Sequence, residues 1–115
     1  MAGQNEIYLI RTPVGERGGL VFGGPLRVRA AGTRAYAGFS STSLARRVCA
    51  HWSMFKNVFV EPWREAIEHD SADERPDSIL FFDQWETFEA YLTAPDAFPF
   101  DKHLIRLYPP PLKFQ

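Results

Sequence analysis

The sequence predicts an α+β fold, in which a single mixed or antiparallel sheet of about five strands carries two or three helices. Seven of the eight glycines lie between Gly15 and Gly38, a distribution typical of short strands joined by tight turns. Two later stretches repeat apolar residues at helical spacing, and two others are short apolar runs that favour strands. We expect one domain over residues 1–115, with flexible or extended ends at 1–5 and 109–115.

The first third of the chain is expected to form strands linked by hairpins. Glycine supplies the positive φ that turns at 15–19 and 30–33 require. In the segment 25–30, apolar and basic residues alternate with a period of two. One face of this strand is therefore predicted to be apolar, and the other, with Arg27 and Arg29, to be exposed and positively charged. The strands are expected at 6–14, 19–24, 25–32 and 33–40.

A helix is predicted from Leu44, because apolar residues recur at Val48, Trp52 and Phe55. The four hydroxyl residues at 40–43 come directly before it, and a serine or threonine side chain can cap the unpaired N–H groups of a first turn. The sequence therefore predicts an N-cap in this run.

The same helix start is a candidate anion site. Ser41 and Ser43 lie beside the free N–H groups, and Arg46 and Arg47 add positive charge in the first turn. Capping alone and capping combined with anion binding are both compatible with the sequence.

Cys49 and His51 are not expected to form a catalytic pair. Residues two apart on a helix are rotated by about 200°, so the thiol and the imidazole point in different directions. We expect Cys49 to border the core and His51 to share the other flank of the helix with Arg47.

The middle of the chain is acidic. Residues 57–63 are either a strand or a loop that leads into a helix opening at Pro62, and Trp63 is expected to anchor in the core. Residues 61–77 hold seven acids and two arginines, which predicts a solvated surface. The acidic patch is expected around Glu65, Glu68 and Asp70.

The last third is predicted to be strand, helix and strand. The run 78–82 is a buried strand, and Asp83 with Glu86 three residues later has the pattern of a capping box. Pro95 ends the helix, 103–108 forms a last strand, and 109–115 is an extended tail. The apolar face of the helix is formed by Trp85, Phe88 and Leu92.

Several classes of function are disfavoured. There is no apolar run of the roughly 18 residues that a membrane helix needs, so no membrane partner is expected. His51, His69 and His103 lack the spacing of metal ligands, and the glycines match neither a phosphate loop nor a dinucleotide fingerprint. No metal or cofactor is therefore expected. One cysteine and an N-terminus without a signal pattern favour the cytoplasm.

The charge is divided between the two halves of the chain. Residues 1–60 carry eight basic and two acidic side chains, a charge of +6, and residues 61–115 carry five basic and twelve acidic ones, a charge of −7. The overall charge of −1 makes nucleic acid an unlikely partner. Either the halves neutralise each other within the fold, or they form faces of opposite sign that suit a charged partner.

The segments 38–52, 57–67 and 77–82 together resemble small bacterial domains of the SseB N-terminal type. In those domains a strand ends in an aromatic residue and hydroxyl residues, a helix closes on tryptophan, and a short amphipathic segment leads to another strand. The resemblance implies an α+β domain that binds another protein, in a toxin-immunity or secretion-linked role.

A second resemblance is to the ADP-ribosyltransferase fold. Arg11 after a first strand, Ser41-Thr42-Ser43 after an aromatic residue, and Gln84 with Glu86 occur in the order of that family's motifs. The resemblance implies that Arg11 holds the NAD pyrophosphate, that Ser41 orients the other groups, and that Glu86 stabilises the oxocarbenium-like centre. In that family, however, the glutamate motif leads into a strand, and here it opens a helix.

The sequence thus favours a non-enzymatic module that binds another protein, with a homo-oligomer left open. Its expected contact residues are Arg27, Arg29, Ser41, Ser43, Arg46, Arg47, Glu65, Glu68 and Asp70. The alternative is a small NAD-dependent enzyme of the ADP-ribosyltransferase type, with Arg11, Ser41 and Glu86 as its catalytic residues.

Overall fold

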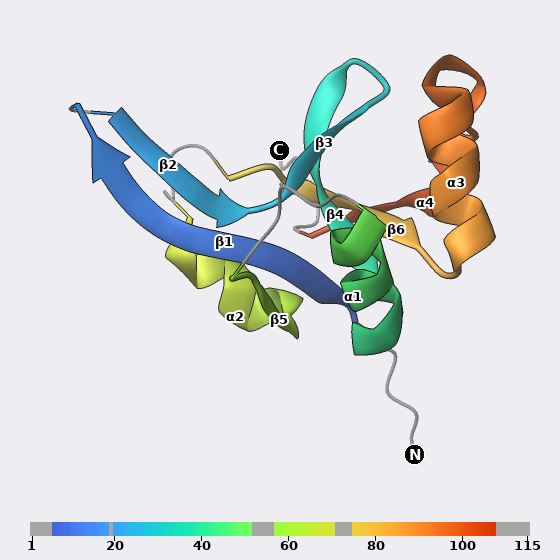
Figure 1. The fold of residues 1–115 in the computed structure, drawn as a ribbon. Coiled ribbons are helices and arrows are strands. Elements are labelled where there is room, and N and C mark those ends of the chain that lie inside the picture. The colour runs from blue at the N-terminus through green and yellow to red at the C-terminus, as the bar shows by residue number, and fades with distance from the viewer. Residues whose placement is uncertain (1–5, 19, 52–56, 71–74, 108–115) are drawn as a thin grey trace, which may run out of the picture.

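The computed structural model describes residues 6–18, 20–51, 57–70 and 75–107, and these form one mixed seven-stranded sheet with helices against both faces (Figure 1). The predicted α+β class is confirmed, although the sheet has more strands than the expected five. The strands are β1 (Tyr8–Arg17), β2 (Leu20–Pro25), β3 (Arg27–Ala30), β4 (Thr33–Phe39), β5 (Phe59–Pro62), β6 (Ser78–Phe82) and β7 (Leu104–Arg106). The helices are α1 (Thr42–His51), α2 (Trp63–Ala66), α3 (Trp85–Thr93) and α4 (Phe100–His103), with 3-10 turns η1 (Ile67–His69) and η3 (Pro95–Ala97).

The two predicted hairpins are present. Gly18 takes a φ of 60° in the turn between β1 and β2. Ala31 and Gly32, with φ of 53° and 87°, form the two-residue turn between β3 and β4. Positive φ at both central residues is the geometry that matches the twist of a tight hairpin.

The sheet forks between β1 and β4. These strands pair only at one end, through Tyr8 with Phe39 and Leu9 with Gly38, and beyond that point each pairs with its own hairpin partner. Leu26 lies where the strands separate: its N–H donates to the Ile10 carbonyl (2.8 Å), and its carbonyl accepts from the Ala37 N–H (3.1 Å). As a result the β1–β2 and β3–β4 hairpins diverge as two arms (Figure 1).

The strands β4 and β6 run parallel in the centre, with β1 and β7 beside them. Because their carboxyl ends meet at one sheet edge, the loops that lead into α1 and α3 are neighbours. The Ser40 hydroxyl joins these loops by donating to the Asp83 carbonyl (2.8 Å).

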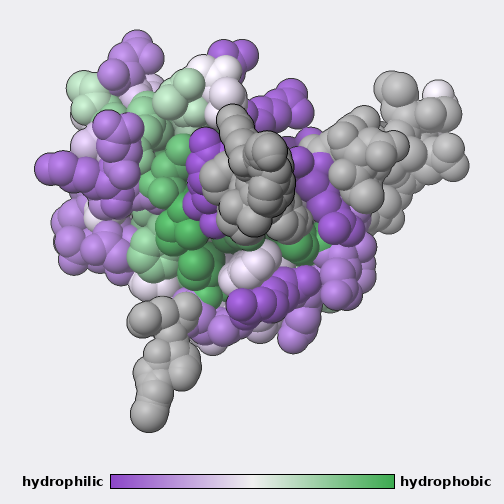
Figure 2. All heavy atoms as spheres, turned by 180° about the vertical axis from the view of Figure 1, so that it is seen from behind, coloured by the Kyte–Doolittle hydropathy of each residue, from purple (hydrophilic) through white to green (hydrophobic). Residues whose placement is uncertain are grey.

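The core has two parts, one on each face of the sheet. The larger part packs α1 and α3 against the sheet, with Phe82 fully buried at its centre. The smaller part packs Ala66 of α2 and Ile67 of η1 against Leu9, Tyr36 and Ile79. Seen from behind, hydrophobic residues gather in the middle of the visible face and hydrophilic residues surround them (Figure 2).

The predictions for the middle of the chain can be compared with the structure within the described residues. Of the two alternatives for 57–63, the strand is present as β5, which ends at Pro62. The helix α2 begins directly after it, at Trp63 and not at Pro62. Trp63 packs against the smaller core, as expected for an anchor. The helix at 44–55 is confirmed to His51, and Trp52 and Phe55 lie outside the described residues, as does the predicted tail at 109–115.

The capping box at α3 does not form. Gln84 is the N-cap, with extended dihedrals (φ −157°, ψ 168°) and no side-chain cap bond, so the helix starts one residue later than predicted. The Asp83 carboxylate instead accepts a bond from the Thr87 hydroxyl (2.6 Å), which lowers the pKa of Asp83. Glu86 is therefore an exposed residue of the first turn and not the reciprocal cap. Trp85, Phe88 and Leu92 do pack on the larger core, and the helix ends before Pro95, as predicted.

Candidate functional site

The β3–β4 hairpin carries a row of arginines on one face. The register places Arg29 opposite Arg34 and Arg27 opposite Tyr36, and the alternation of side chains puts all four on the same side of the hairpin. Leu26 and Ala37 are a hydrogen-bonded pair, and hydrogen-bonded and non-hydrogen-bonded pairs alternate along antiparallel strands. Arg29 and Arg34 are therefore a pair that does not exchange backbone bonds. Side chains are closest at such pairs, so the two guanidinium groups are held near each other.

The three arginines, together with Val28, line a groove of about 370 Å³. We refer to it as the arginine groove. Arg29 and Arg34 are exposed, and within the described parts of the chain neither forms an ion pair with an acidic side chain. Like charges that lie directly opposite each other on two strands destabilise a hairpin, which leaves this pair poised for an anionic partner.

Arg27 shares a face of the hairpin with Arg29, as predicted, but it is not exposed there. Its Nη2 donates to both carboxylate oxygens of Asp70, at 2.5 and 2.7 Å, and the two side chains are only 22% and 9% exposed. The ion pair joins β3 to the segment that follows η1. Arg27 is therefore a structural wall of the groove whose charge is already neutralised.

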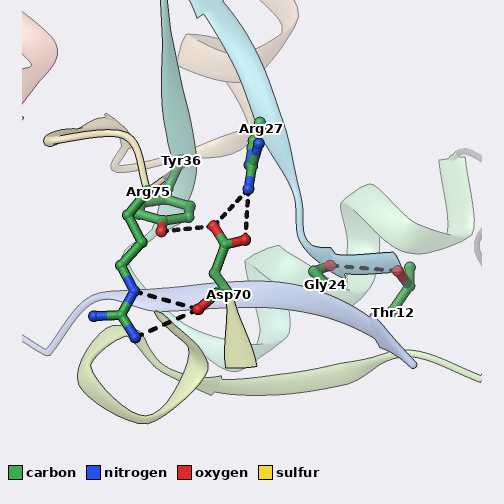
Figure 3. A network of polar contacts seen from close by, with 6 residues as sticks. All are labelled: Thr12, Gly24, Arg27, Tyr36, Asp70 and Arg75. Atoms are coloured by element: carbon green, nitrogen blue, oxygen red, sulfur yellow. Dashed lines mark hydrogen bonds and ion pairs between the residues drawn. The ribbon is translucent and has the colours of Figure 1, made fainter. Parts of the chain in front are cut away.

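Asp70 is the centre of a polar network. Figure 3 shows Arg27, Tyr36 and Arg75 approaching it from different elements. The Tyr36 hydroxyl donates to Oδ2 (2.9 Å), and the Arg75 guanidinium donates to the Asp70 main-chain carbonyl (3.4 Å). Burial, followed by the bond to Asp70 and its charge, raises the pKa of Tyr36 far above its ordinary value. Thr12, also drawn, donates to the Gly24 carbonyl (3.3 Å) and ties β1 to β2.

The predicted acidic patch is therefore reduced to its outer members. Glu65 in α2 and Glu68 in η1 are exposed, whereas Asp70 is directed inward and bound. A run of acids suggests a solvated surface, but here one of them lies within reach of a guanidinium and a phenol from distant strands.

The predicted cap at the start of α1 is confirmed. The Ser41 Oγ accepts a bond from the Leu44 N–H (3.1 Å), and Ser43 lies exposed in the first turn. The Ser41 hydroxyl oxygen therefore already accepts a bond from its own helix. Arg46, in the same helix, is exposed.

On the flank of α1, Arg47 and His51 meet the ring of Trp85 from α3. The Arg47 guanidinium lies 4.3 Å from the ring centroid, and the His51 ring lies edge-on at 5.5 Å. The prediction that Arg47 and His51 share a flank is confirmed, and the surface that they share is an aromatic ring.

Cys49 is buried on the inner side of α1, and its burial raises the pKa of the thiol, with the nearby Arg46 charge opposing this. We expect Ellman's reagent to react with native Cys49 much more slowly than with the thiol in urea, because reaction needs an exposed thiolate. The raised pKa also means that the protein loses stability as the pH rises from the pKa of the unfolded thiol through that of the folded one. Equal rates in the native and unfolded protein would show that Cys49 is accessible.

The three residues of the ADP-ribosyltransferase resemblance occupy different surroundings. Ser41 and Glu86 follow the parallel strands β4 and β6 and so lie toward the same sheet edge. Arg11 is bound to Glu61, with Nε and Nη2 donating to one carboxylate oxygen at 3.1 and 2.5 Å, and its guanidinium lies 4.4 Å from the ring centroid of Phe59. Arg11 would have to leave Glu61 before it could hold a pyrophosphate.

Arg34 is the residue that sequence reasoning missed. The signal was present: counting outward from the Ala31-Gly32 turn pairs Ala30 with Thr33 and then Arg29 with Arg34. The alternation along β3 alone does not identify Arg34, which is found only when the pairing is continued across the turn.

Within the described ranges, no group of three or more His, Cys, Asp or Glu side chains is arranged to hold a metal ion. Nor, over the same residues, is any helix both long and apolar enough to cross a bilayer. Comparison with protein families, with curated proteins and with solved structures finds no match to this chain.

Proposed function

We propose that this protein is a binding module that recognises an acidic segment of a partner protein through Arg29 and Arg34 of the β3–β4 hairpin. The observation that carries the proposal is the cross-strand pair itself: two exposed arginines held opposite each other, without an acidic partner among the described residues. Two carboxylates that enter between them would relieve the repulsion and form charge-assisted, bidentate bonds.

The rigidity of the groove supports the proposal. Arg27 is held by Asp70, and Asp70 in turn is held by Tyr36 of the neighbouring strand. These contacts therefore hold the backbone that carries Arg29 and Arg34, so a partner does not have to order it on binding.

A protein segment fits this surface better than nucleic acid does. Glu65 and Glu68 are exposed on the segment α2–η1, whose end at Asp70 is bound to the wall of the arginine groove. The overall charge of −1 disfavours a long chain of phosphates, whereas two acidic side chains need only the guanidinium groups of Arg29 and Arg34. The SseB-type resemblance agrees with a module that binds proteins, and its toxin-immunity or secretion-linked setting is part of the same hypothesis.

We expect a fluorescein-labelled, glutamate-rich peptide to bind the protein and the R29E/R34E double variant to bind it at least about tenfold more weakly, as loss of two charge-assisted contacts requires. Fluorescence anisotropy at low and high salt measures this, with affinity falling as salt rises. The matched control is R46E/R47E, which reverses the same number of charges on α1. It should lose only the affinity that the change in overall charge removes, and so bind the peptide more tightly than R29E/R34E does. Equal losses in the two double variants, or no binding by the wild type, would refute the hairpin as the binding surface.

A further inference from the structure

A second groove adjoins the arginine groove. It has a volume of about 620 Å³ and lies between the tip of the β3–β4 hairpin and the segment formed by α3, η3 and α4. Figure 1 shows the hairpin and α3 standing beside each other. Arg29 lines both grooves: its side chain lies on the face of the hairpin that carries the arginine groove, and its carbonyl is directed toward α3. The two grooves therefore meet at the outer edge of β3, and a ligand that crosses this edge contacts both.

The width of this groove is fixed by a hydrogen bond. The backbone groups of Arg29 point away from β4, because Arg29 and Arg34 do not exchange backbone bonds. The outward carbonyl of Arg29 accepts a bond from the Tyr91 hydroxyl (2.8 Å), which ties α3 to the hairpin. The groove is thereby preformed and does not depend on a ligand to bring its walls together.

The floor of the groove is aromatic and held by packing. The rings of Tyr91 and Phe100 meet edge to face, with centroids 6.3 Å apart, and both rings also contact Phe98 of the core. Ala31 and Pro95 also line the groove and add small apolar surfaces. Partly buried aromatic rings with fixed orientation favour an aromatic guest, which can pack edge to face against them.

The charges of the two walls differ in sign. Arg29 stands on the hairpin side, and the exposed Asp96 of η3 stands on the opposite side. Acidic residues of a bound segment are therefore favoured toward the arginines and disfavoured beyond the aromatic floor.

We propose that this groove holds an aromatic anchor residue of the same acidic partner segment, with the acidic side chains on the Arg29 side and a neutral or basic residue on the Asp96 side. This inference rests on the proposed function, since the arginine groove supplies the first contact. Charge then selects and orients the segment, and the aromatic anchor supplies apolar burial.

The test compares labelled peptides that differ at a single position. The affinity of a glutamate-rich peptide that carries one phenylalanine beside the glutamates is compared with that of the same peptide with alanine. Each peptide is also made with its sequence reversed. We expect the phenylalanine peptide to bind about tenfold more tightly in one direction, which is the gain that burial of an aromatic side chain gives. Placing a lysine beyond the phenylalanine should strengthen binding, and a glutamate there should weaken it.

Two variants test whether the phenylalanine side chain binds in this groove. D96W places a large ring in the lining of the groove and should abolish the advantage of the phenylalanine peptide over the alanine peptide. E89W, which removes the same charge and adds the same side chain at an exposed position of α3 outside the groove lining, is the control and should retain the advantage. Thermal unfolding of each variant verifies that it is folded.

The outcomes separate the two proposals. If the alanine peptide binds but phenylalanine adds nothing, the aromatic groove is refuted and the arginine site stands. If the advantage survives in D96W, the anchor binds elsewhere and the groove is again refuted. If no glutamate-rich peptide binds, the proposed function and this inference both fail.

Discussion

Replacing Phe82 with alanine is expected to lower the free energy of unfolding by about 4 kcal/mol, the largest effect of any single substitution proposed for this chain. Phe82 is fully buried at the end of β6. Its ring centroid lies 5.7 Å from that of Phe39, 5.2 Å from Phe88, 5.6 Å from Tyr91 and 6.1 Å from Phe98. Removing the ring leaves a cavity among side chains that are themselves fixed by one another.

Urea unfolding followed by circular dichroism measures the loss. Because about 4 kcal/mol is a large share of the stability of a small domain, F82L is the companion variant, and it should lose roughly a third to a half as much. F59A is the control: Phe59 is 46% exposed on β5, and its removal should cost about 1 kcal/mol or less. Equal losses for Phe82 and Phe59 would contradict the position of the core.

Replacing Asp70 with alanine is expected to cost about 3 kcal/mol, because removal of one partner from a largely buried ion pair leaves the other without compensation. The loss falls at the lower end of such values because Arg27 keeps 22% of its side-chain surface exposed. The Tyr36 hydroxyl, in a residue with no exposed surface, loses its acceptor as well. Urea unfolding again provides the measurement.

A double-mutant cycle with Y36F tests whether the network acts as a unit. Y36F alone should cost about 1 kcal/mol, and D70A with Y36F together should cost less than the sum of the two single changes. E65A removes an exposed carboxylate of the same acidic segment and should change stability by no more than about 0.5 kcal/mol. Strict additivity of Asp70 and Tyr36, or a loss in E65A as large as in D70A, would contradict the network.

Features that depend on neighbours along the chain could be predicted from the sequence. The two-residue turn at Ala31-Gly32, the alternation along β3, the serine cap of α1 and the buried strand β6 all follow from local backbone preferences and periodicity. The same local reasoning places the N-cap of α3 at Asp83, one residue too early. The Asp83 carboxylate accepts a bond from the Thr87 hydroxyl and does not cap the helix.

Features that depend on distant contacts could not be predicted. Arg27 alternates like an exposed strand residue, and Asp70 lies in a run of acids, so each looks solvated in its own segment. Their pairing depends on η1 packing beneath the β3–β4 hairpin, and no local pattern encodes that. The aromatic groove is of the same kind, because Arg29 and Tyr91 come together only when α3 docks on the larger core.

The parallel pair of β4 and β6 has a consequence for the order of folding. Each hairpin of the forked sheet closes a turn of a few residues, whereas β6 can join β4 only after the chain from residue 40 to residue 77 has been brought back across the sheet. Closing so long a loop costs conformational entropy before any contact compensates for it. We therefore expect the meeting of these two strands to be the slow event, with both hairpins formed before it. The arginine pair on β3 and β4 belongs to a hairpin that forms before this step, so its mutual repulsion is expected to lower the folding rate more than it shortens the lifetime of the native state.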